Sequence, residues 1–502
     1  MSNTQIQKIV IVGGGTAGWI SAAALAKLLP PSISVTLIES DSIATVGVGE
    51  ATIPQIRRLN GMLGLNENTF LKATKGTIKL GIEFSNWGKI GESYLHTFGD
   101  VGLNLSNLQF HHYWKRAQEE GKQSSLWDYS LHHKVAYSNK FDRLERIGKT
   151  GMTGLSYAFH FDAGLYARFL RNFAETSGVT RIEGFVKQTV LNPHTGFIDH
   201  VKLENGTQIE GDLFIDCSGF RGLLIDKALG VSYQDWTHWL PCNRAIAVPS
   251  QSTRPLVPYT KSIAHTAGWQ WCIPLQHRTG NGHVYSDQFM QDETALEVLL
   301  SNLDSTPIAE PNHIRFTTGR REKFWHKNCI SIGLSSGFLE PLESTSIHLI
   351  QSNISRLIEL LPTKKMEPAN SNEYNRQVSK EYELIRDFII LHYHCTQRED
   401  SDFWRYCKNM DIPDSLKQKL ELFSATGRIH KEPEDLFREA SWVQVMIGQG
   451  LIPQSYHAMA DRLSTDQLEK FLADIDAIIA QAEAQLPSHE DFLTRNCQLD
   501  LQ

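Results

Sequence analysis

The sequence lacks the features that mark membrane, secreted and nucleic-acid-binding proteins. No apolar run approaches the about 18 residues of a spanning helix, and the polar N-terminus differs from a secretory signal. The seven cysteines are scattered without a CxxC motif, which excludes a disulfide framework or a cysteine zinc site. A net charge of −7, from 49 basic and 56 acidic residues, argues against nucleic acid. We therefore expect a cytoplasmic protein with no membrane or nucleic-acid partner.

The sequence also has no linker rich in proline, glycine or serine, and no internal repeat. Helical patterns dominate from about residue 370, with helices expected over residues 373–393 and from a capping box at Ser464 to about residue 484. We expect a core of residues 1–370 and a helical C-terminal region, 371–502, packed on it. The histidine pairs at 111–112 and at 392 and 394 lack the spacing of metal ligands, so we expect no metal site.

A nucleotide-binding pattern stands near the N-terminus. The segment KIVIVGGGTAGW (8–19) places a short apolar strand before a glycine loop, and a helix is expected over residues 17–29. Gly13 permits the tight turn, Gly15 the approach of a pyrophosphate, and Gly18 close helix–strand packing. Glu39 ends the next strand, 34–38, where an acid would hold ribose hydroxyls. The same loop predicts two further cofactor contacts, at Thr16 and Ala17.

The elements that follow distinguish between classes of nucleotide-binding protein. We expect a helix over residues 162–177, with its apolar side formed by Leu165, Phe169, Leu170 and Phe173. A β-meander of strands 181–183, 186–191 and 197–203 comes next, then an Asn205-Gly206 hairpin and a buried strand ending in a glycine turn (212–219). A nicotinamide dehydrogenase would continue with further βα units. This order resembles FAD-dependent hydroxylases, in which the meander backbone holds the adenine, here at Val186. The expected fold class is α/β: a Rossmann-type sheet, a β-meander and a substrate-side sheet, with a helical C-terminal layer.

Two further segments carry candidate functional residues. Residues 77–85 alternate like one strand, with Lys79 on its polar face, where a lysine taken alone would be solvated. In GWQWCIP (268–274), Trp269, Trp271 and Ile273 fall on one strand face. By spacing alone, these large side chains predict a filled core.

The pattern Trp269-x-Trp271-x-Ile273-Pro274 resembles the fingerprint of the flavin-dependent halogenases. The blocks GVGEAT (47–52), GTIKLGIEF (76–84) and EPLESTSIH (340–348) resemble the tryptophan-halogenase branch of that family, and the likeness covers nearly the whole chain. It implies that reduced FAD, oxygen and chloride or bromide give hypohalous acid, which halogenates an indole-type aromatic substrate. It also implies a separate NAD(P)H:flavin reductase as a transient partner, and a homodimer is a family-level expectation.

The resemblance assigns catalysis to Lys79, which would receive the hypohalous acid, and to Glu343, which would accept the ring proton; Glu340 is the competing carboxylate. Thr345 and Ser346 match the halide site, although many relatives carry glycine where this chain has Ser346. The expected substrate contacts are His96 and Phe98, whose rings would sandwich the indole, and Trp442. Further expected cofactor contacts are Gly49, Ala51, Leu334 and Ile347.

One departure from the family bears on the substrate. Enzymes for free tryptophan carry a tyrosine pair in the late helical region, and the corresponding stretch here, residues 441–450, lacks it. Loss of that clamp favours indole, substituted indoles or an indole on a larger molecule over free tryptophan.

Two other functions stay open at this point. An FAD-dependent aromatic hydroxylase would transfer oxygen instead of halogen, and it would reduce its flavin with bound NAD(P)H. A non-catalytic flavin-binding protein is the second alternative. The tryptophan fingerprint and Lys79 weigh against the first, and Lys79 with Glu343 weighs against the second.

Overall fold

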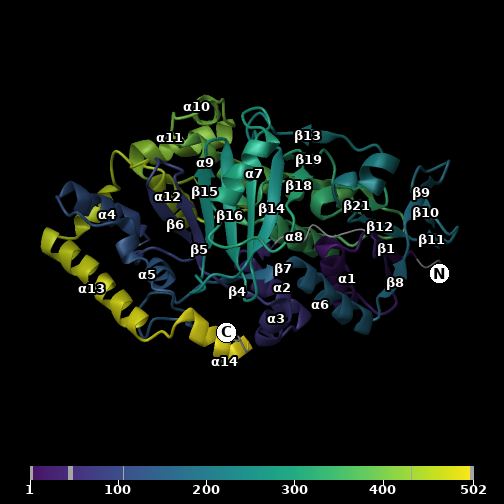
Figure 1. The fold of residues 1–502 in the computed structure, drawn as a ribbon, viewed down its shortest axis with the longest axis horizontal. Coiled ribbons are helices and arrows are strands. Elements are labelled where there is room, and N and C mark those ends of the chain that lie inside the picture. The colour runs from purple at the N-terminus through teal and green to yellow at the C-terminus, as the bar shows by residue number, and fades with distance from the viewer. Residues whose placement is uncertain (1–3, 43–48, 106, 431, 498–502) are drawn as a thin grey trace. The chain divides into compact units, whose positions relative to one another are not determined.

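A computed structural model of the chain describes residues 4–42, 49–105, 107–430 and 432–497 (Figure 1). Its residues form two compact units, each assembled from three chain segments. Unit 1 contains Met1–Gly76, Phe161–Asn243 and Arg315–Glu383, and unit 2 contains Thr77–His160, Arg244–Ile314 and Leu384–Gln502. Among the described residues, no helix is both long and apolar enough to cross a bilayer.

Unit 1 is built on a six-stranded, mainly parallel sheet. The apolar residues of its central strand are buried, as expected for a parallel strand covered on both faces. The strand order is β20 (Trp325–His326), β21 (Cys329–Ser331), β12 (Leu213–Asp216), β1 (Lys8–Val12), β2 (Ser34–Glu39) and β8 (Thr180–Glu183). Helix α1 (Thr16–Leu28) packs against α6 (Ala163–Thr176) and α8 (Ser346–Glu359). The predicted Rossmann-type arrangement is confirmed.

Two predictions for this unit were wrong in detail. The segment predicted as the first meander strand is β8, which pairs in parallel with β2 in the main sheet. The meander is instead β9 (Val186–Leu191), β10 (Ile198–Leu203) and β11 (Gln208–Glu210), and the predicted Asn205-Gly206 turn joins the last two. The turn is confirmed, with Gly206 at φ 86°.

The predicted apolar side of α6 was also displaced by about one residue. The helix buries Tyr166, Leu170 and Ala174, whereas Leu165, Phe169 and Phe173 are partly exposed. The Tyr166 ring packs edge-on against Phe70 of α3 (Glu67–Thr74) at 5.5 Å, and alanines on the same face allow close packing on α1. An amphipathic tyrosine therefore takes the central position that the sequence pattern assigned to phenylalanine.

Unit 2 is built on a seven-stranded sheet in which every residue of the central β16 is buried. The strand order is β18 (Asn312–Arg315), β14 (Arg244–Ser250), β17 (Thr279–Tyr285), β16 (Gly268–Pro274), β15 (Thr260–His265), β5 (Gly81–Ser85) and β6 (Ser93–Thr97). Trp269 and Trp271 are thus core residues, as their spacing predicts, with ring centroids 6.2 Å apart.

The segment predicted as one strand over residues 77–85 is broken at Leu80. It forms β4 (Thr77–Lys79) and β5, because the Leu80 N–H donates to the Pro258 carbonyl at 2.7 Å and the Leu80 carbonyl accepts from the Phe98 N–H at 3.0 Å. β4 pairs with β7 (Ala158–Asp162), and Lys79 lies opposite Ala158. Lys79 is fully buried, so the solvated position suggested by simple alternation is wrong.

The late helices match the predicted pattern. α9 (Pro368–His394) covers the expected helix, and α13 (Thr465–Ala484) begins at the Ser464 capping box. In Figure 1 the yellow α13 lies beside α4 (Phe110–Glu119) and α5 (Leu131–Tyr137), on which it packs. The predicted boundary at residue 370 falls near the start of α9 and stays a prediction. The remaining long helices are α2 (Gln55–Leu63), α7 (Asp292–Ser301), α10 (Asp402–Asn409), α11 (Asp414–Thr426), α12 (Glu439–Gly448) and α14 (His489–Cys497).

Candidate active site

The glycine loop of unit 1 is closed on one side and open on the other. Gly13 has φ 115°, and a Cβ there would lie 2.2 Å from the Cys217 carbonyl oxygen. A Cβ on Gly18 would lie 1.9 Å from the Gly13 carbonyl oxygen, so both positions need glycine. A Cβ on Gly15, the N-cap residue of α1, would meet no atom within 4 Å. The space beside Gly15, at the start of α1, is therefore open, and a helix start with such space suits a pyrophosphate.

Glu39 lies at the end of β2 and above this loop. Its carboxylate is 2.6 Å from Arg181 Nε and accepts a hydrogen bond from Trp19 Nε1 at 3.3 Å. A Cβ on Gly14 would lie 1.6 Å from Glu39 Oε2, so this third glycine admits the carboxylate. Neither Gly14 nor Arg181 was predicted from the sequence as a site residue. The glycine triplet was a signal for the first, whereas the Arg181 contact depends on the pairing of β8 with β2.

The EPLEST segment places two buried carboxylates before helix α8. Glu340 and Glu343 are both fully buried, and Glu343 ends the short 3-10 helix Pro341–Glu343. Ser344 is left-handed, with φ 59°, and turns the chain into α8. Thr345, the N-cap residue, is buried, and its Oγ1 has no hydrogen-bond partner among the described residues. Such an orphan hydroxyl beside free helix N–H groups suits an anion.

These features fit a bound FAD and halide. The open face at Gly15 suits the pyrophosphate of FAD, and the carboxylate of Glu39 suits its ribose hydroxyls. The orphan Thr345 hydroxyl suits the halide. Residues 47 and 48 of the GVGEAT block lie outside the described residues. The other predicted cofactor contacts all lie in unit 1: Thr16 and Ala17 open α1, Gly49 and Ala51 bound β3 (Gly49–Ala51), Val186 opens β9, Leu334 is half-buried and Ile347 is buried in α8.

The predicted substrate contacts lie in unit 2. Lys79 Nζ is 5.2 Å from the ring centroid of Phe98, within the range of a cation–π contact. The His96 ring is buried on β6, 5.6 Å from Phe388, and Phe388 is 4.8 Å from Trp442. Phe388 therefore connects His96 to Trp442. Lys79 is connected to Phe98 by its amine and by the bond between the Phe98 N–H and the carbonyl of the next residue, Leu80.

Two aromatic residues of this group were not predicted from the sequence. Phe388 and Phe437 stack with their ring centroids 3.9 Å apart and an interplanar angle of 17°. Phe437 also lies 6.3 Å from His96. Phe388 falls within a long amphipathic helix, where a core role is the ordinary interpretation, and Phe437 lies in a segment without a pattern.

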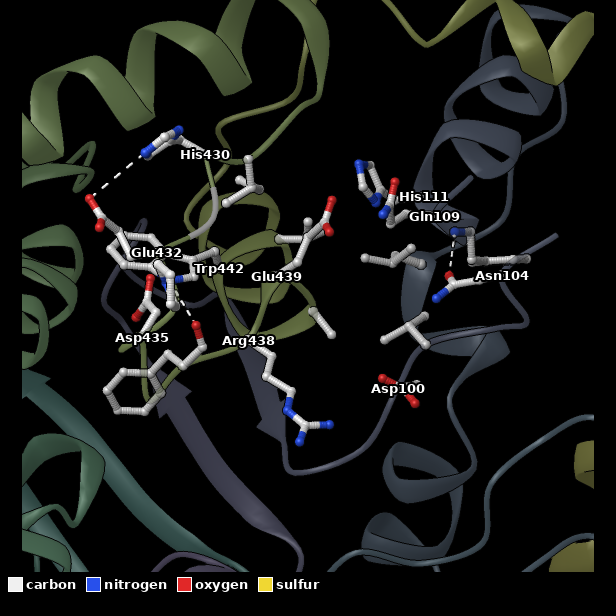
Figure 2. Close-up of a pocket in the computed structure, with 18 residues that line it drawn as sticks. Asp100, Asn104, Gln109, His111, His430, Glu432, Asp435, Arg438, Glu439 and Trp442 are labelled. Carbon is white, nitrogen blue, oxygen red and sulfur yellow. Dashed lines mark hydrogen bonds and ion pairs between the residues drawn. The ribbon is translucent and has the colours of Figure 1, made fainter. Parts of the chain in front are cut away.

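A cavity of about 430 Å³ adjoins these aromatic residues (Figure 2). Phe437 and Trp442 line one side, together with Arg438, and the chain around Asp100 and His111 lines the other. Figure 2 shows Arg438, Glu439 and Asp100 around the open space between the two sides. A cavity of this volume accommodates a small organic molecule.

The described residues contain no group of three or more histidine, cysteine or acidic side chains arranged to hold a metal ion. His111 and His112 lie on α4, with ring centroids 4.2 Å apart. His392 and His394 end α9. All four are helix residues.

Comparison with known proteins identifies the family. The tryptophan halogenase family model matches residues 8–465. A tryptophan 6-halogenase from Streptomyces albogriseolus is 35% identical, with 98% of each chain covered. The solved structure of a flavin-dependent halogenase from Xanthomonas campestris superposes with a TM-score of 0.95 and 46% identity, over 98% of this chain and 99% of the other. A second such structure, BrvH from Brevundimonas sp. BAL3, gives 0.95 and 42% over the same shares.

These matches span the whole architecture, so they apply to both units. They favour a halogenase over the hydroxylase and over the non-catalytic flavin-binding protein. Together with the glycine loop and the EPLEST segment, these matches show that the chain belongs to the tryptophan halogenase family. It is a halogenating oxidoreductase that uses reduced FAD and a halide.

Proposed function

We propose that this protein halogenates an indole other than free tryptophan: indole itself, a substituted indole or an indole carried by a larger molecule. The single observation that carries the halogenation itself is the fully buried Lys79 with its amine 5.2 Å from the centre of the Phe98 ring. A separate NAD(P)H:flavin reductase supplies reduced FAD. Bound FAD supplies hypohalous acid from oxygen and bromide or chloride, and the remaining steps fall to the side chains of this chain.

In unit 1, the N–H groups at Gly15 and along the start of α1 hold the pyrophosphate, and Glu39 holds the ribose. The start of α8 holds the halide through Thr345 and Ser346. The other cofactor contacts follow the positions already described: Thr16, Ala17, Gly49, Ala51, Val186, Leu334 and Ile347. Arg181 keeps the Glu39 carboxylate in place through its bond at 2.6 Å.

In the halogenation step, Lys79 donates a hydrogen bond to the oxygen of hypohalous acid, which makes the halogen more electrophilic. The ring carbon forms its bond to the halogen as the oxygen–halogen bond breaks. The departing hydroxide takes the proton that Lys79 donates and leaves as water, and the carboxylate of Glu343 accepts the ring proton. No external oxidant beyond the hypohalous acid is needed.

The structure of α12 supports a substrate without an amino-acid group. In the stretch that lacks the tyrosine pair, two glutamine side chains form hydrogen bonds within the protein. Gln444 Oε1 accepts from the Thr97 N–H at 3.0 Å and from the Thr97 hydroxyl at 2.9 Å, and Gln449 Nε2 donates to the His392 carbonyl at 2.9 Å. Neither amide is aimed at holding a charged amino acid.

The cavity also favours an indole that carries a substituent. The cavity beside Trp442 has room for a substituent on the indole. His96 and Phe98 supply the flat faces against which the ring stacks.

The test is the Lys79→Ala variant, assayed with a flavin reductase, FAD, bromide and indole. Removing the amine should lower bromoindole formation by about 100-fold or more, because one positioned proton donor contributes that much. FAD affinity, measured by flavin fluorescence, should change less than about twofold. Lys89→Ala is the control, since Lys89 is exposed and pairs only at the surface with Glu92. Bromination at the parent rate by Lys79→Ala would overturn the proposal.

A further inference from the structure

Strand β4, which carries Lys79, is tied on two sides to buried histidines. His160 lies on β7 directly opposite Thr77. His489 opens α14, the last helix of the chain. Both are fully buried in unit 2. Neither histidine is among the catalytic residues that the family resemblance assigns, so their role beside the short strand β4 is unexplained.

The hydrogen bonds around His160 have one consistent direction. The Thr77 hydroxyl donates to the Pro274 carbonyl at 2.6 Å, because a carbonyl oxygen can only accept a hydrogen bond. That hydroxyl must therefore accept the other bond, from His160 Nδ1 at 2.9 Å. His160 Nε2 is then the unprotonated nitrogen, and it accepts from the Thr260 hydroxyl at 2.9 Å. The chain runs from β15 through His160 and Thr77 to the last residue of β16.

Pro274 is also the last residue of the tryptophan fingerprint. The bond from Thr77 consequently joins the strand of Lys79 to the fingerprint strand two residues before the lysine. Within this series of hydrogen bonds, from Thr260 to Pro274, every polar side-chain atom has a protein partner. The series is therefore a rigid connection.

His489 holds the same strand one residue closer to the lysine. The Ile78 N–H donates to His489 Nε2 at 3.2 Å, and the opposite nitrogen, Nδ1, lies 2.8 Å from the Leu256 carbonyl. Because a carbonyl only accepts, Nδ1 carries the proton and Nε2 the lone pair. This tautomer fixes the Thr77–Ile78 peptide unit, one residue before Lys79.

Both rings must stay neutral for these bonds to exist, and their surroundings keep them so. Burial lowers the pKa of His489 to about 4, against smaller opposing effects of its bond to Leu256 and of Glu490. Burial also holds the pKa of His160 well below its ordinary value, and the nearby Lys79 and His489 lower it further. A protonated ring would lose the acceptor that each connection requires.

We propose that His160 and His489 are positioning residues for Lys79. They fix β4 to the fingerprint strand and to α14, and so hold the Lys79 amine at one place against Phe98. The inference rests on the proposed role of Lys79. Its consequence is that a loosened amine lets hypohalous acid escape, because halogen transfer depends on geometry within about 1 Å.

The experiment compares His160→Ala, His489→Ala and the conservative His489→Gln with His283→Ala. His283 is the matched control: it is a fully buried histidine of the same unit, with its pKa lowered to about 4, but it bonds the Ala295 carbonyl and is not linked to β4. Each holoenzyme is assayed for bromoindole formed per reduced FAD consumed, and free hypobromous acid is trapped with a diketone scavenger. The reactivity of Lys79 towards an acylating reagent, measured by peptide mass spectrometry, reports the amine without flavin.

We expect His160→Ala and His489→Ala to lower bromoindole per reduced FAD about 10-fold, with a matching rise in trapped hypobromous acid and altered Lys79 acylation. His283→Ala should leave that ratio and the acylation rate within about twofold of the parent values. His489→Gln should restore most of the coupling, which is the bromoindole formed per reduced FAD consumed. If the alanine variants do not fold, Thr77→Val replaces them, because it removes only the hydroxyl that connects His160 to Pro274. Coupling equal to that of the His283 control would overturn the positioning role. Retained coupling in Lys79→Ala would instead overturn the proposed function.

Discussion

At the residue scale, the glycines of the first loop have separable tasks. Gly13 adopts a conformation that side chains rarely take, and its neighbour Cys217 leaves no space for a Cβ, whereas Gly15 faces open space. We expect Gly13→Ala to lower the free energy of unfolding by about 2 kcal/mol or more through strain and overlap. Gly15→Ala should change it by less than about 0.5 kcal/mol, yet weaken FAD binding about 10-fold.

Denaturant unfolding and flavin titration of the two variants provide the measurement. Equal destabilisation by both substitutions would contradict the division of tasks. So would unchanged FAD binding in Gly15→Ala.

These glycine roles could be predicted because they follow from local backbone geometry, whereas the burial of Lys79 could not. Alternation placed Lys79 on a polar face, and nothing local to it signals that Pro258 and Phe98 bond Leu80 and break the strand. The stacked pair of Phe388 and Phe437 escaped prediction for the same reason, since 49 positions separate them in sequence.

At the element scale, α13 depends on its first turn. The Ser464 hydroxyl accepts from the Gln467 N–H at 3.2 Å, and the Gln467 side chain accepts from the Ser464 N–H at 2.9 Å. Ser464→Ala should therefore destabilise the protein by about 1 kcal/mol, measured as the shift in denaturant midpoint. Ser464→Asp, which keeps an acceptor at the N-cap, should cost less than half as much. An alanine variant as stable as the parent protein would show that α13 does not need its cap.

Elements were predictable where sequence signals are local. The capping box, the Asn205-Gly206 turn and the long α9 were all placed correctly, because each is marked by adjacent or periodic residues. The assignment of β8 failed because its length and composition suit a meander strand equally well. Its partner β2 lies about 140 residues earlier in the chain, and only the folded sheet shows that pairing.

At the scale of the whole molecule, several buried histidines make stability depend on pH. Burial lowers the pKa of four of them from 6.5 to about 4: His111, His132, His283 and His489. Between these values the unfolded chain binds protons that the folded chain does not, so acidification destabilises the fold. Each histidine contributes a slope of at most about 1.4 kcal/mol per pH unit.

We expect the melting temperature to fall steadily as the pH drops from about 6.5 towards 4 and to be nearly flat from 7 to 8. Scanning fluorimetry across this range is the measurement. His283→Gln should make the dependence shallower. A melting temperature unchanged between pH 7 and pH 5 would contradict the neutral, buried state of these rings.

The fold class was predictable at this scale because the order of elements is distinctive of flavin-binding proteins. The assembly of each unit from three chain segments was not, since the chain carries no composition change at the points where it passes between units. The family resemblance supplied the candidate residues of both units. Their burial and hydrogen bonds came only from the folded structure.

The most direct measurement incubates the purified protein with FAD, NADH, an unrelated flavin reductase, oxygen and bromide, and offers indole and tryptophan in parallel. The products are analysed by mass spectrometry. The account predicts a bromine isotope doublet on indole and a weak or absent one on tryptophan. A doublet on tryptophan alone, or oxygen added to indole without bromine, would contradict it.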